Sequence, residues 1–473
     1  MRRVLQFLLL IVPLLAVSAL LQAADAQSPT IVHAGGRFGD VTIYQPAGPV
    51  KGVVLFVSGD AGWRLGVTGM AQHLADDGAL VVGIDVGYYL SRIGAAGDRC
   101  VSLAADFEQL SHDVQKLLRV PGYLSPVLAG YSSGATIVYA VLAQAPPGTF
   151  AGAMSLGFCA DQDFHKAKLC GGLHYTVNGR GDYVLEPDQK LQDSWIALQG
   201  QQDMVCNPAE VDRFAAQVPK ARVLRLPKVG HGFGVERNWL PQFREAALQL
   251  QSAAVAPVSR QPPERQSLDQ LPLVEVPAAA DSSQDLLAVI ISGDGGWAGL
   301  DRQIAAELSR RGIPVVGIDS LRYFWHARTP EETARDVAAV ASHYSVLWHR
   351  PRVALIGYSF GADVLPFVVN RLPADVAARL AGVALIEPSS SATFEIHVSN
   401  WLPGVETPGL DLAPELAKLR LPLLCLHGEE TAGSICHAAP RAAVEQVGRG
   451  HHLGGDSGAI TDRLLAILRG SRT

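Results

Sequence analysis

Short apolar runs alternate with amphipathic stretches along both halves of the chain. In the second half, one such stretch covers 301–311 and places Ile304, Ala305 and Leu308 on one helical face. Apolar runs predict strands at 286–291, 314–318, 353–356, 383–386 and 423–426, and amphipathic stretches predict helices at 301–311, 331–347 and 362–372. Because the apolar runs alternate with helices, we expect a mostly parallel sheet with helices on both faces, which is an α/β fold.

The two halves repeat each other in sequence. Three blocks recur in the same order, and the spacing between the second and third is slightly longer in the first half. The matching pairs are 57–63 with 291–297, 81–85 with 315–319, and 130–135 with 357–362. We therefore predict two tandem domains from an internal duplication, with an insertion in the first that includes 94–100.

A polar stretch containing Pro257, Pro262 and Pro263 separates the halves and lacks sustained periodicity. We predict a signal peptide at 1–26, a first domain at 27–252, a linker at 253–270 and a second domain at 271–473. A chain of 473 residues is long enough for two such domains.

The N-terminus has the pattern of a secretory signal. Arg2 and Arg3 precede an almost entirely apolar run at 4–21, and Ala24 and Ala26 place small residues where a signal peptidase reads. We expect cleavage after Ala26 and export of a protein that does not span the membrane. The alternative interpretation is an uncleaved membrane anchor.

Composition narrows the classes of function. The formal net charge is only −6, so nothing in the bulk charge indicates a nucleic-acid partner. The six cysteines divide into four in the first half and two in the second, which permits disulfides within each half of an exported protein. Cys425 lies in an apolar strand and is alternatively a buried free thiol. No CxxC pair with zinc spacing occurs, so we expect neither a metal nor another cofactor.

The second half contains a G-x-S-x-G pentapeptide centred on Ser359, between a predicted strand and a predicted helix. A tight turn in this context lifts a serine hydroxyl above the sheet, and the helix N-terminus directs its amides at the reacting carbonyl. The first half repeats the arrangement around Ser132. Both serines are therefore candidate nucleophiles, and the alternative for each is a capping residue in an ordinary turn.

A nucleophilic serine needs a base and an acid that orients the base, in the chain order serine, acid, histidine. The first half offers Asp203 and His231 after Ser132. In the second half, His452 is the preferred base, with His451 second. Its acid is Glu430 or Glu429, or comes from elsewhere, because the residue at the place of Asp203 is Thr431. The alternative makes both glutamates solvated loop charges.

Two backbone amides should stabilise the oxyanion of the reaction. One belongs to Phe360, directly after Ser359. The other should come from the turn at 293–296, where Asp294 and Gly295 follow the first strand of the half. The alternative is a flexible glycine turn without a role in binding.

With these motifs the chain resembles the bacterial AcvB/VirJ family of exported α/β-hydrolase-like proteins. The resemblance rests on the signal peptide, the Ser-Gly-Asp-Gly-Gly-Trp block at 292–297, the elbow at 357–362, Cys436 and the block at 450–456. It implies a periplasmic lysyl-phosphatidylglycerol hydrolase linked to virulence and type IV secretion. Shorter members look like the second half alone, so the resemblance implies Ser359 as nucleophile and His452 as base.

Hydrolysis of this lipid would transfer the lysyl group to serine and release phosphatidylglycerol. A cationic acyl group favours carboxylates near the site, and Asp294 and Glu387 follow strands expected to end there. The alternative role for Asp294 is to hold the glycine turn by hydrogen bonds. Two other hypotheses stay open, namely an esterase or thioesterase of broad range, and a non-catalytic binding protein of a secretion apparatus.

Overall fold

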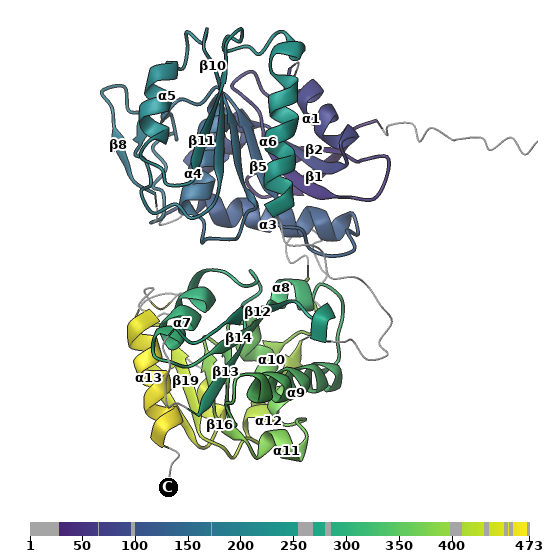
Figure 1. Cartoon of the computed structure of the whole chain (residues 1–473), viewed down its shortest axis with the longest axis vertical. Helices are drawn as coiled ribbons and strands as arrows, with labels where there is room; N and C mark the ends of the chain where they lie inside the picture. Colours follow the sequence, from purple (N-terminus) through teal and green to yellow (C-terminus); the bar gives the residue numbers. More distant parts are fainter. Residues whose placement is uncertain are drawn as a thin grey trace, which may run out of the picture.

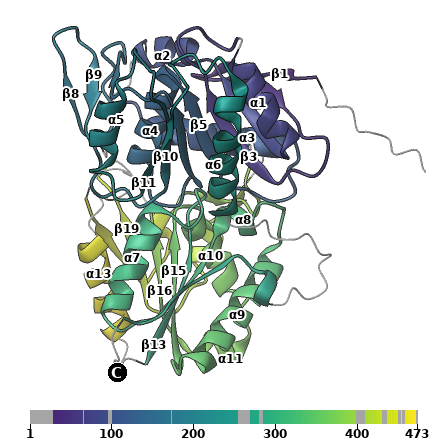
Figure 2. The ribbon, with the colours of Figure 1, turned by 45° about the horizontal axis from the view of Figure 1, so that its top comes forward.

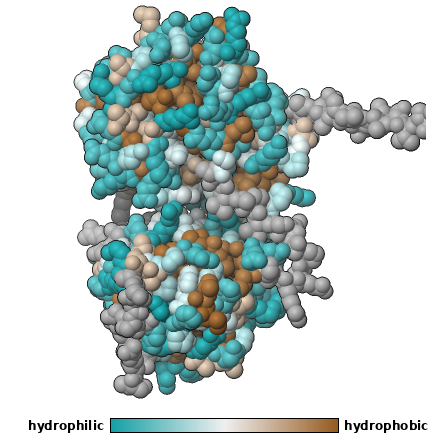
Figure 3. All heavy atoms as spheres, in the orientation of Figure 1, coloured by the Kyte–Doolittle hydropathy of each residue, from teal (hydrophilic) through white to brown (hydrophobic). Residues whose placement is uncertain are grey.

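The computed structural model describes residues 28–64, 66–95, 100–171, 173–253, 268–279, 285–397, 409–429, 435–448, 453 and 457–470. The predicted signal peptide, Glu430, His451 and His452 lie outside these residues. Within them, no helix combines the length and the apolar character needed to cross a membrane. On the face drawn in Figure 3, hydrophilic residues cover most of both halves, with smaller apolar patches between them.

The first half contains an eight-stranded sheet in the order β1-β2-β4-β3-β5-β6-β10-β11. β2 is antiparallel to both of its neighbours, and all other neighbours are parallel. The strands are β1 (Thr30–Gly35), β2 (Gly39–Tyr44), β3 (Gly52–Val57), β4 (Ala79–Ile84), β5 (Val127–Tyr131), β6 (Gly152–Leu156), β10 (Trp195–Gly200) and β11 (Ala221–Leu226). The strand order reverses direction at β3 and β5, and open α/β sheets bind ligands at such a reversal.

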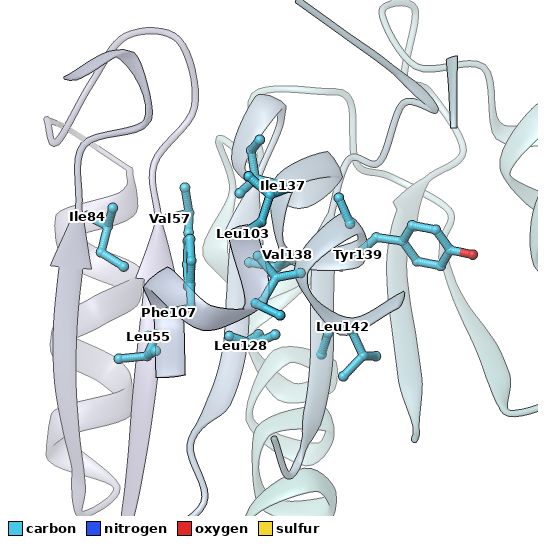
Figure 4. Close-up of a cluster of buried hydrophobic side chains, with 14 of the residues drawn as sticks. Leu55, Val57, Ile84, Leu103, Phe107, Leu128, Ile137, Val138, Tyr139 and Leu142 are labelled. Carbon is cyan, nitrogen blue, oxygen red and sulfur yellow. The ribbon is translucent and has the colours of Figure 1, made fainter. Parts of the chain in front are cut away.

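Helices cover both faces of this sheet (Figure 1). The elements are α1 (Val67–Asp76), α2 (Val86–Gly94), α3 (Leu103–Leu117), α4 (Ser133–Gln144), α5 (Pro208–Ala215), α6 (Leu240–Ala253) and the short η1 (Glu236–Asn238). One buried cluster joins the sheet to α2, α3, α4 and α5, and another joins its opposite face to α1 and α6. In the first cluster, Val57 of β3 and Leu128 of β5 lie beside Phe107 of α3 and Val138 of α4 (Figure 4).

The second half contains a seven-stranded sheet in the order β12-β14-β13-β15-β16-β19-β20. β12 is antiparallel to β14 and the other neighbours are parallel. The strands are β12 (Leu273–Val276), β13 (Leu286–Ile291), β14 (Val315–Ile318), β15 (Arg352–Tyr358), β16 (Leu380–Ile386), β19 (Leu423–His427) and β20 (Ala442–Gln446). This order repeats that of the first half without its outermost strand.

Helices α7 (Gly299–Arg310) and α13 (Ser457–Gly470) lie side by side on one face of the second sheet (Figures 1 and 2). The other helical elements are η2 (Leu268–Gln270), α8 (Ser320–Tyr323), α9 (Pro330–Leu347), α10 (Phe360–Val369), α11 (Ala374–Ala377), α12 (Ala413–Leu416) and η3 (Ile435–Ala438). A buried cluster packs α9, α10 and α12 against the opposite face of the sheet. Both halves are therefore three-layered α/β units, as the alternating pattern predicts.

Each unit also contains a small additional sheet. A three-stranded sheet in the order β7-β9-β8 belongs to the first half, and a two-stranded sheet to the second. Their strands are β7 (Asp161–Gln162), β8 (Tyr175–Val177), β9 (Tyr183–Leu185), β17 (Ser391–Ala392) and β18 (Leu410–Asp411).

Seven of the eight predicted elements differ from the observed ones, by a few residues at their ends. The helix expected from 362 begins at Phe360, because Ser359 occupies the position before the first helical residue, although its side chain makes no capping hydrogen bond. The longer spacing in the first half coincides with α2, which has nine residues where α8 has four. The predicted linker at 253–270 overlaps the last residue of α6 and the whole of η2.

All six cysteines are paired within their own halves, as Cys100–Cys170, Cys159–Cys206 and Cys425–Cys436. The alternative of a free thiol at Cys425 is therefore wrong. Its partner follows it after a short loop, and both sulfurs are shielded by the core of the second half. Disulfides are typical of proteins that fold outside the cytosol.

The two halves contact each other along α3 and the segment that follows it (Figure 1). Trp325 donates its indole N–H to the Val120 carbonyl at 2.8 Å, and Lys116 donates to the Trp325 carbonyl at 2.6 Å. The ring of Tyr123, from the first half, is buried in the core cluster of the second. The first half thereby covers the edge of the second sheet where β13 and β15 end.

Candidate functional site

Both candidate serines occupy the same strained backbone position. Ser132 has φ 54° and ψ −121°, and Ser359 has φ 51° and ψ −118°. Each follows a central strand and precedes a helix, and neither hydroxyl caps that helix. The alternative of an ordinary capping serine therefore does not describe either residue. Non-glycine residues with positive φ are costly, and such strain clusters at functional sites.

The glycines of both pentapeptides are sterically required. A Cβ on Gly134 would lie 2.3 Å from the Val57 carbonyl oxygen, and one on Gly361 would lie 2.0 Å from that of Ile291. Likewise, a Cβ on Gly130 would lie 2.1 Å from the carbonyl oxygen of Gly134. The turn can close on the neighbouring strand only without these side chains, which explains the G-x-S-x-G spacing.

In the first half, the predicted serine, histidine and aspartate form a hydrogen-bonded chain. The Nε2 atom of His231 lies 2.9 Å from the Ser132 Oγ, and its Nδ1 atom lies 2.9 Å from the Asp203 Oδ2. The Asp203 carboxylate is fully buried, whereas the His231 side chain is 15% exposed. A histidine between a serine and a buried carboxylate can accept the hydroxyl proton and remain oriented while charged.

The Asp203 carboxylate is held by more than the histidine. Its Oδ1 accepts the backbone N–H groups of Val205 and Cys206, each at 2.9 Å, and its Oδ2 accepts the Gln199 amide at 3.1 Å. The Cys159–Cys206 disulfide anchors this loop to the segment after β6. Asp203, Cys206 and His231 are also close enough for a metal, but the Cys206 sulfur is already bonded to Cys159.

The loop that carries His231 packs against the turn at Ser132. Tyr131 donates its hydroxyl to the His231 carbonyl at 3.0 Å, and burial together with Asp203 and Asp60 raises the pKa of this tyrosine. A Cβ on Gly157 would lie 3.2 Å from the imidazole and 3.5 Å from the Asp203 Oδ2. The absence of a side chain at Gly157 therefore leaves room for the acid–base pair.

The repeated Ser-Gly-Asp-x-Gly-Trp block forms the turn beside each elbow. A Cβ on Gly59 would lie 3.1 Å from that of Ser132, and one on Gly293 would lie 3.7 Å from that of Ser359. These turns therefore lie directly beside the two serines. In the second half, the Gly295 N–H is bonded to the Asp294 Oδ1 at 3.1 Å, so Asp294 holds the turn, which was its alternative role.

Two other features of the repeated blocks serve packing. The Trp63 indole covers Gly83 of β4, where a Cβ would lie 2.2 Å from the ring, and Trp297 covers Gly317 of β14 in the same way. The aspartates that follow these strands cap α2 and α8. These residues recur because they fix the turns, not because they react.

The turn of the second half opens into a cavity of about 160 Å³ that both halves line. Ser359, Asp294 and Asp301 line it from the second half, and Glu108 and Thr149 line it from the first. Burial, with a contribution from Asp294, raises the pKa of Glu108 to about 8. Burial also lowers the pKa of the nearby His112 to about 4, so this imidazole is neutral at neutral pH.

The remaining predicted residues of the second half are dispersed. Glu429 is exposed and its backbone N–H donates to the Gly448 carbonyl. Glu387 is 4% exposed, its carboxylate accepts the Gly428 N–H, and it does not line the cavity at Ser359. Phe360 provides the first backbone N–H of α10, next to Ser359. The predicted bases His452 and His451 and the predicted acid Glu430 lie outside the described residues.

The sequence interpretation missed the residues that line the Ser359 cavity from the first half. Glu108 and Thr149 lie far from every motif, and only the packing of the halves brings them to the site. Asp301 carried a usable signal, because the duplication places Val67 at the matching position of the first half. A carboxylate in one repeat at the position of a buried apolar residue in the other indicates that the two repeats differ in function at that position.

The sheet order, the two elbows and the hydrogen-bonded Ser132, His231 and Asp203 define an α/β-hydrolase fold. The family model described as "Bacterial virulence protein (VirJ)" matches residues 51–171 and 285–472, which together exceed half of the chain. The chain therefore belongs to the VirJ family. The curated proteins compared with it include no match.

Solved structures of hydrolases resemble a part of the chain. The esterase domain of a Rhodothermus marinus protein is 12% identical, covers 48% of this chain and 99% of its own, and has a TM-score of 0.34. Est1E from Butyrivibrio proteoclasticus is 12% identical over 48% of this chain and 100% of its own, with a TM-score of 0.33. An α/β serine hydrolase homologue from Coxiella burnetii is 16% identical over 48% and 97%, with a TM-score of 0.32.

Proposed function

We propose that this protein is a serine hydrolase that cleaves carboxylic esters through an acyl-enzyme intermediate. The observation that carries the proposal is the hydrogen-bonded chain from Ser132 through His231 to Asp203 at a strained elbow. Its distances are those of a nucleophile, a general base and an orienting acid.

The reaction proceeds in two steps, acylation of the serine and hydrolysis of the acyl-serine. His231 takes the proton of Ser132 as the Oγ atom attacks the ester carbonyl, and the amide of Ser133 and the turn at 59–62 face the oxyanion that forms. Collapse breaks the ester bond, and His231 returns the proton to the departing alcohol. Water then attacks the acyl-serine with the same base, which releases the acid and restores the hydroxyl.

A second part of the proposal concerns the substrate and the compartment in which the enzyme works. We infer from membership of the VirJ family that the ester is the aminoacyl ester of lysyl-phosphatidylglycerol and that the enzyme works in the periplasm. Three disulfides are compatible with export. The carboxylates next to Ser359 support a cationic acyl group. The products would be lysine and phosphatidylglycerol, and components of type IV secretion are proposed partners.

The proposal is tested with purified wild-type protein and with Ser132→Ala, Ser359→Ala and the double variant. A fluorophosphonate probe should label the wild type, and free lysine should be released from lysyl-phosphatidylglycerol vesicles. Loss of label in Ser132→Ala identifies the first half as reactive, and residual label lost only in the double variant identifies both halves. Turnover of simple acyl esters without release of lysine would favour the alternative hypothesis of an esterase of broad substrate range. Absence of any label would favour the non-catalytic binding protein and refute the hydrolase.

A further inference from the structure

The cavity beside Ser359 is a composite of the two halves. A Cβ built on Gly295 would lie 3.0 Å from the Glu108 Oε1, so the carboxylate of α3 reaches over the turn of the second half. The corresponding residue of the first half is Ala61. Glycine at 295 therefore leaves the space that Glu108 occupies, and the difference between the repeats has a physical reason.

Two buried polar groups on the wall of this cavity lack partners among the described residues. Asp301 is 2% exposed, and its Oδ2 accepts the Gly293 N–H at 3.4 Å while its Oδ1 has no partner. Thr149 is 6% exposed, and its hydroxyl has no partner either. Buried polar groups normally find hydrogen-bond partners, so both groups indicate a polar ligand.

The charges on the wall specify which ligand. Glu108, Asp294 and Asp301 are acidic, and none of the described residues that line the cavity is a lysine or an arginine. The cation nearest in sequence to this face, Arg302, donates to the Pro147 carbonyl at 2.8 Å instead. Burial, with a smaller contribution from Asp294, raises the pKa of Glu108, and a cation bound beside it would favour the charged form of this carboxyl.

The spacing of the carboxylates favours an organic cation over a metal ion. Among the described residues, the only group of three or more potential metal ligands close enough to hold one ion is Asp203, Cys206 and His231 of the first half. The acidic groups around Ser359 are too widely spaced for one ion. An ammonium group carries several N–H donors and can contact separate carboxylates and a hydroxyl.

We propose that this composite cavity is the subsite for the ammonium group of an aminoacyl ester, with Glu108 of the first half as a specificity-determining residue. The carboxylates accept the ammonium N–H groups, and Thr149 accepts a further one. Ser359 lies on the same wall, so a cation bound here places its acyl carbon near that hydroxyl. The inference rests on the proposed hydrolase only for the reaction at Ser359, and the binding of the cation is independent of it.

The direct test is calorimetric binding of L-lysinamide to the full chain carrying Ser132→Ala and Ser359→Ala, which prevents turnover. Its diacetylated form, which lacks both ammonium groups, is the neutral probe. We expect lysinamide to bind and the diacetyl form not to bind. Glu108→Gln should weaken lysinamide about tenfold or more, since hydrogen bonds to charged groups contribute about 1.5–3 kcal/mol.

The matched control is Glu245→Gln, since Glu245 lies on α6 and pairs with Arg222 away from the cavity. It should leave lysinamide affinity unchanged. Asp301→Asn is a second test variant, and thermal melting verifies that each variant is folded. Equal affinity for both probes, or no effect of Glu108→Gln and Asp301→Asn in folded protein, overturns the subsite. Displacement of lysinamide by millimolar calcium would also overturn it, in favour of a metal site.

A turnover measurement separates this inference from the proposed function. In the Ser132→Ala chain, ethyl lysinate should be cleaved faster than ethyl hexanoate, and Glu108→Gln should remove the preference. If ethyl hexanoate is cleaved and no Glu108-dependent preference exists, the subsite fails while the hydrolase stands. If no ester is cleaved but lysinamide binding depends on Glu108, the subsite stands and Ser359 is not a nucleophile.

Discussion

Glu387 occupies in the second half the backbone position that Gly157 occupies in the first. Each residue follows the strand next to the elbow strand, with φ 56° for Glu387 and 65° for Gly157. Their N–H groups donate to matching carbonyls, those of Leu426 and Leu198. Because a side chain at Gly157 would point at the acid–base pair of the first half, Glu387 directs a carboxylate to the corresponding place of the second.

This position predicts that Glu387 orients the base of the second half, in place of the acid that Thr431 cannot supply. In a Ser132→Ala chain, Glu387→Gln should lower ester turnover about 10²- to 10⁴-fold, because the base loses its orienting charge. The pH profile of kcat/KM should shift as well. Glu245→Gln, which changes a surface glutamate of α6 that pairs with Arg222, is the control and should retain turnover. An unchanged rate and pH profile in folded Glu387→Gln would assign the residue to the structure of the Gly428 turn alone.

The first triad makes a parallel prediction. In a Ser359→Ala chain, Asp203→Asn should reduce hydrolysis of p-nitrophenyl butyrate by about four orders of magnitude, because the histidine is then held in the wrong tautomer. Asp212→Asn is the matched control, since Asp212 pairs with Arg225 on the surface of α5. Full activity of Asp203→Asn would be incompatible with a charge-assisted base at His231.

The Cys159–Cys206 disulfide stabilises the fold and also holds the loop that carries Asp203. Cys159→Ala combined with Cys206→Ala should lower the free energy of unfolding by about 2–4 kcal/mol, since it releases a loop closed over 47 residues. It should also lower turnover at Ser132, because the Cys206 N–H holds Asp203. Denaturant titration and kcat/KM measure the two effects. Removing Cys100–Cys170 in the same way should affect stability alone.

The second elbow is predicted to be intolerant of a methyl group. Gly361→Ala should destabilise the second half by about 3 kcal/mol or more, because its Cβ would overlap the Ile291 carbonyl. Gly179→Ala is the control, since nothing lies within 4 Å of a Cβ there, and its effect should stay within about 1 kcal/mol. Calorimetric unfolding distinguishes the two. Similar stability of both variants would refute the close approach of the elbow to β13.

The charge of the composite cavity predicts a pH dependence of stability. Glu108 has a pKa of about 8 in the folded chain and 4.5 as its ordinary value, so the folded state binds more protons between these values. The contribution of Glu108 to the free energy of unfolding should therefore fall as pH rises from 4.5 to 8, whereas the lowered pKa of His112 makes an opposite contribution between about 4 and 6.5. The titratable groups that interact with Glu108 are Asp294 and Tyr123, and His112, on the same helix α3, interacts with Asp294. Glu108→Gln should flatten this slope in denaturant titrations, and an unchanged slope would contradict a protonated Glu108.

The sequence alone determined the α/β class, the duplication and the two elbows. Strand and helix periods are local properties, and the elbow is specified by glycines that a short contact with the next strand requires. The chain order of the motifs also selected Ser132, Asp203 and His231, which lie in hydrogen-bond contact. In the second half the chain order also admits Glu387, which lies between Ser359 and His452, but the analogy with Asp203 favoured Glu430 and Glu429.

Only the tertiary structure decided what surrounds Ser359. Glu108 and Thr149 belong to the first half, and Asp301 lies in the first turn of α7, whose periodicity is that of an ordinary helix. Their convergence depends on the packing of α3 against the second sheet, through contacts such as those of Trp325 with Val120. Periodicity records which residues share a face of one element, whereas a composite site depends on how separate elements pack, and that information is spread over both halves.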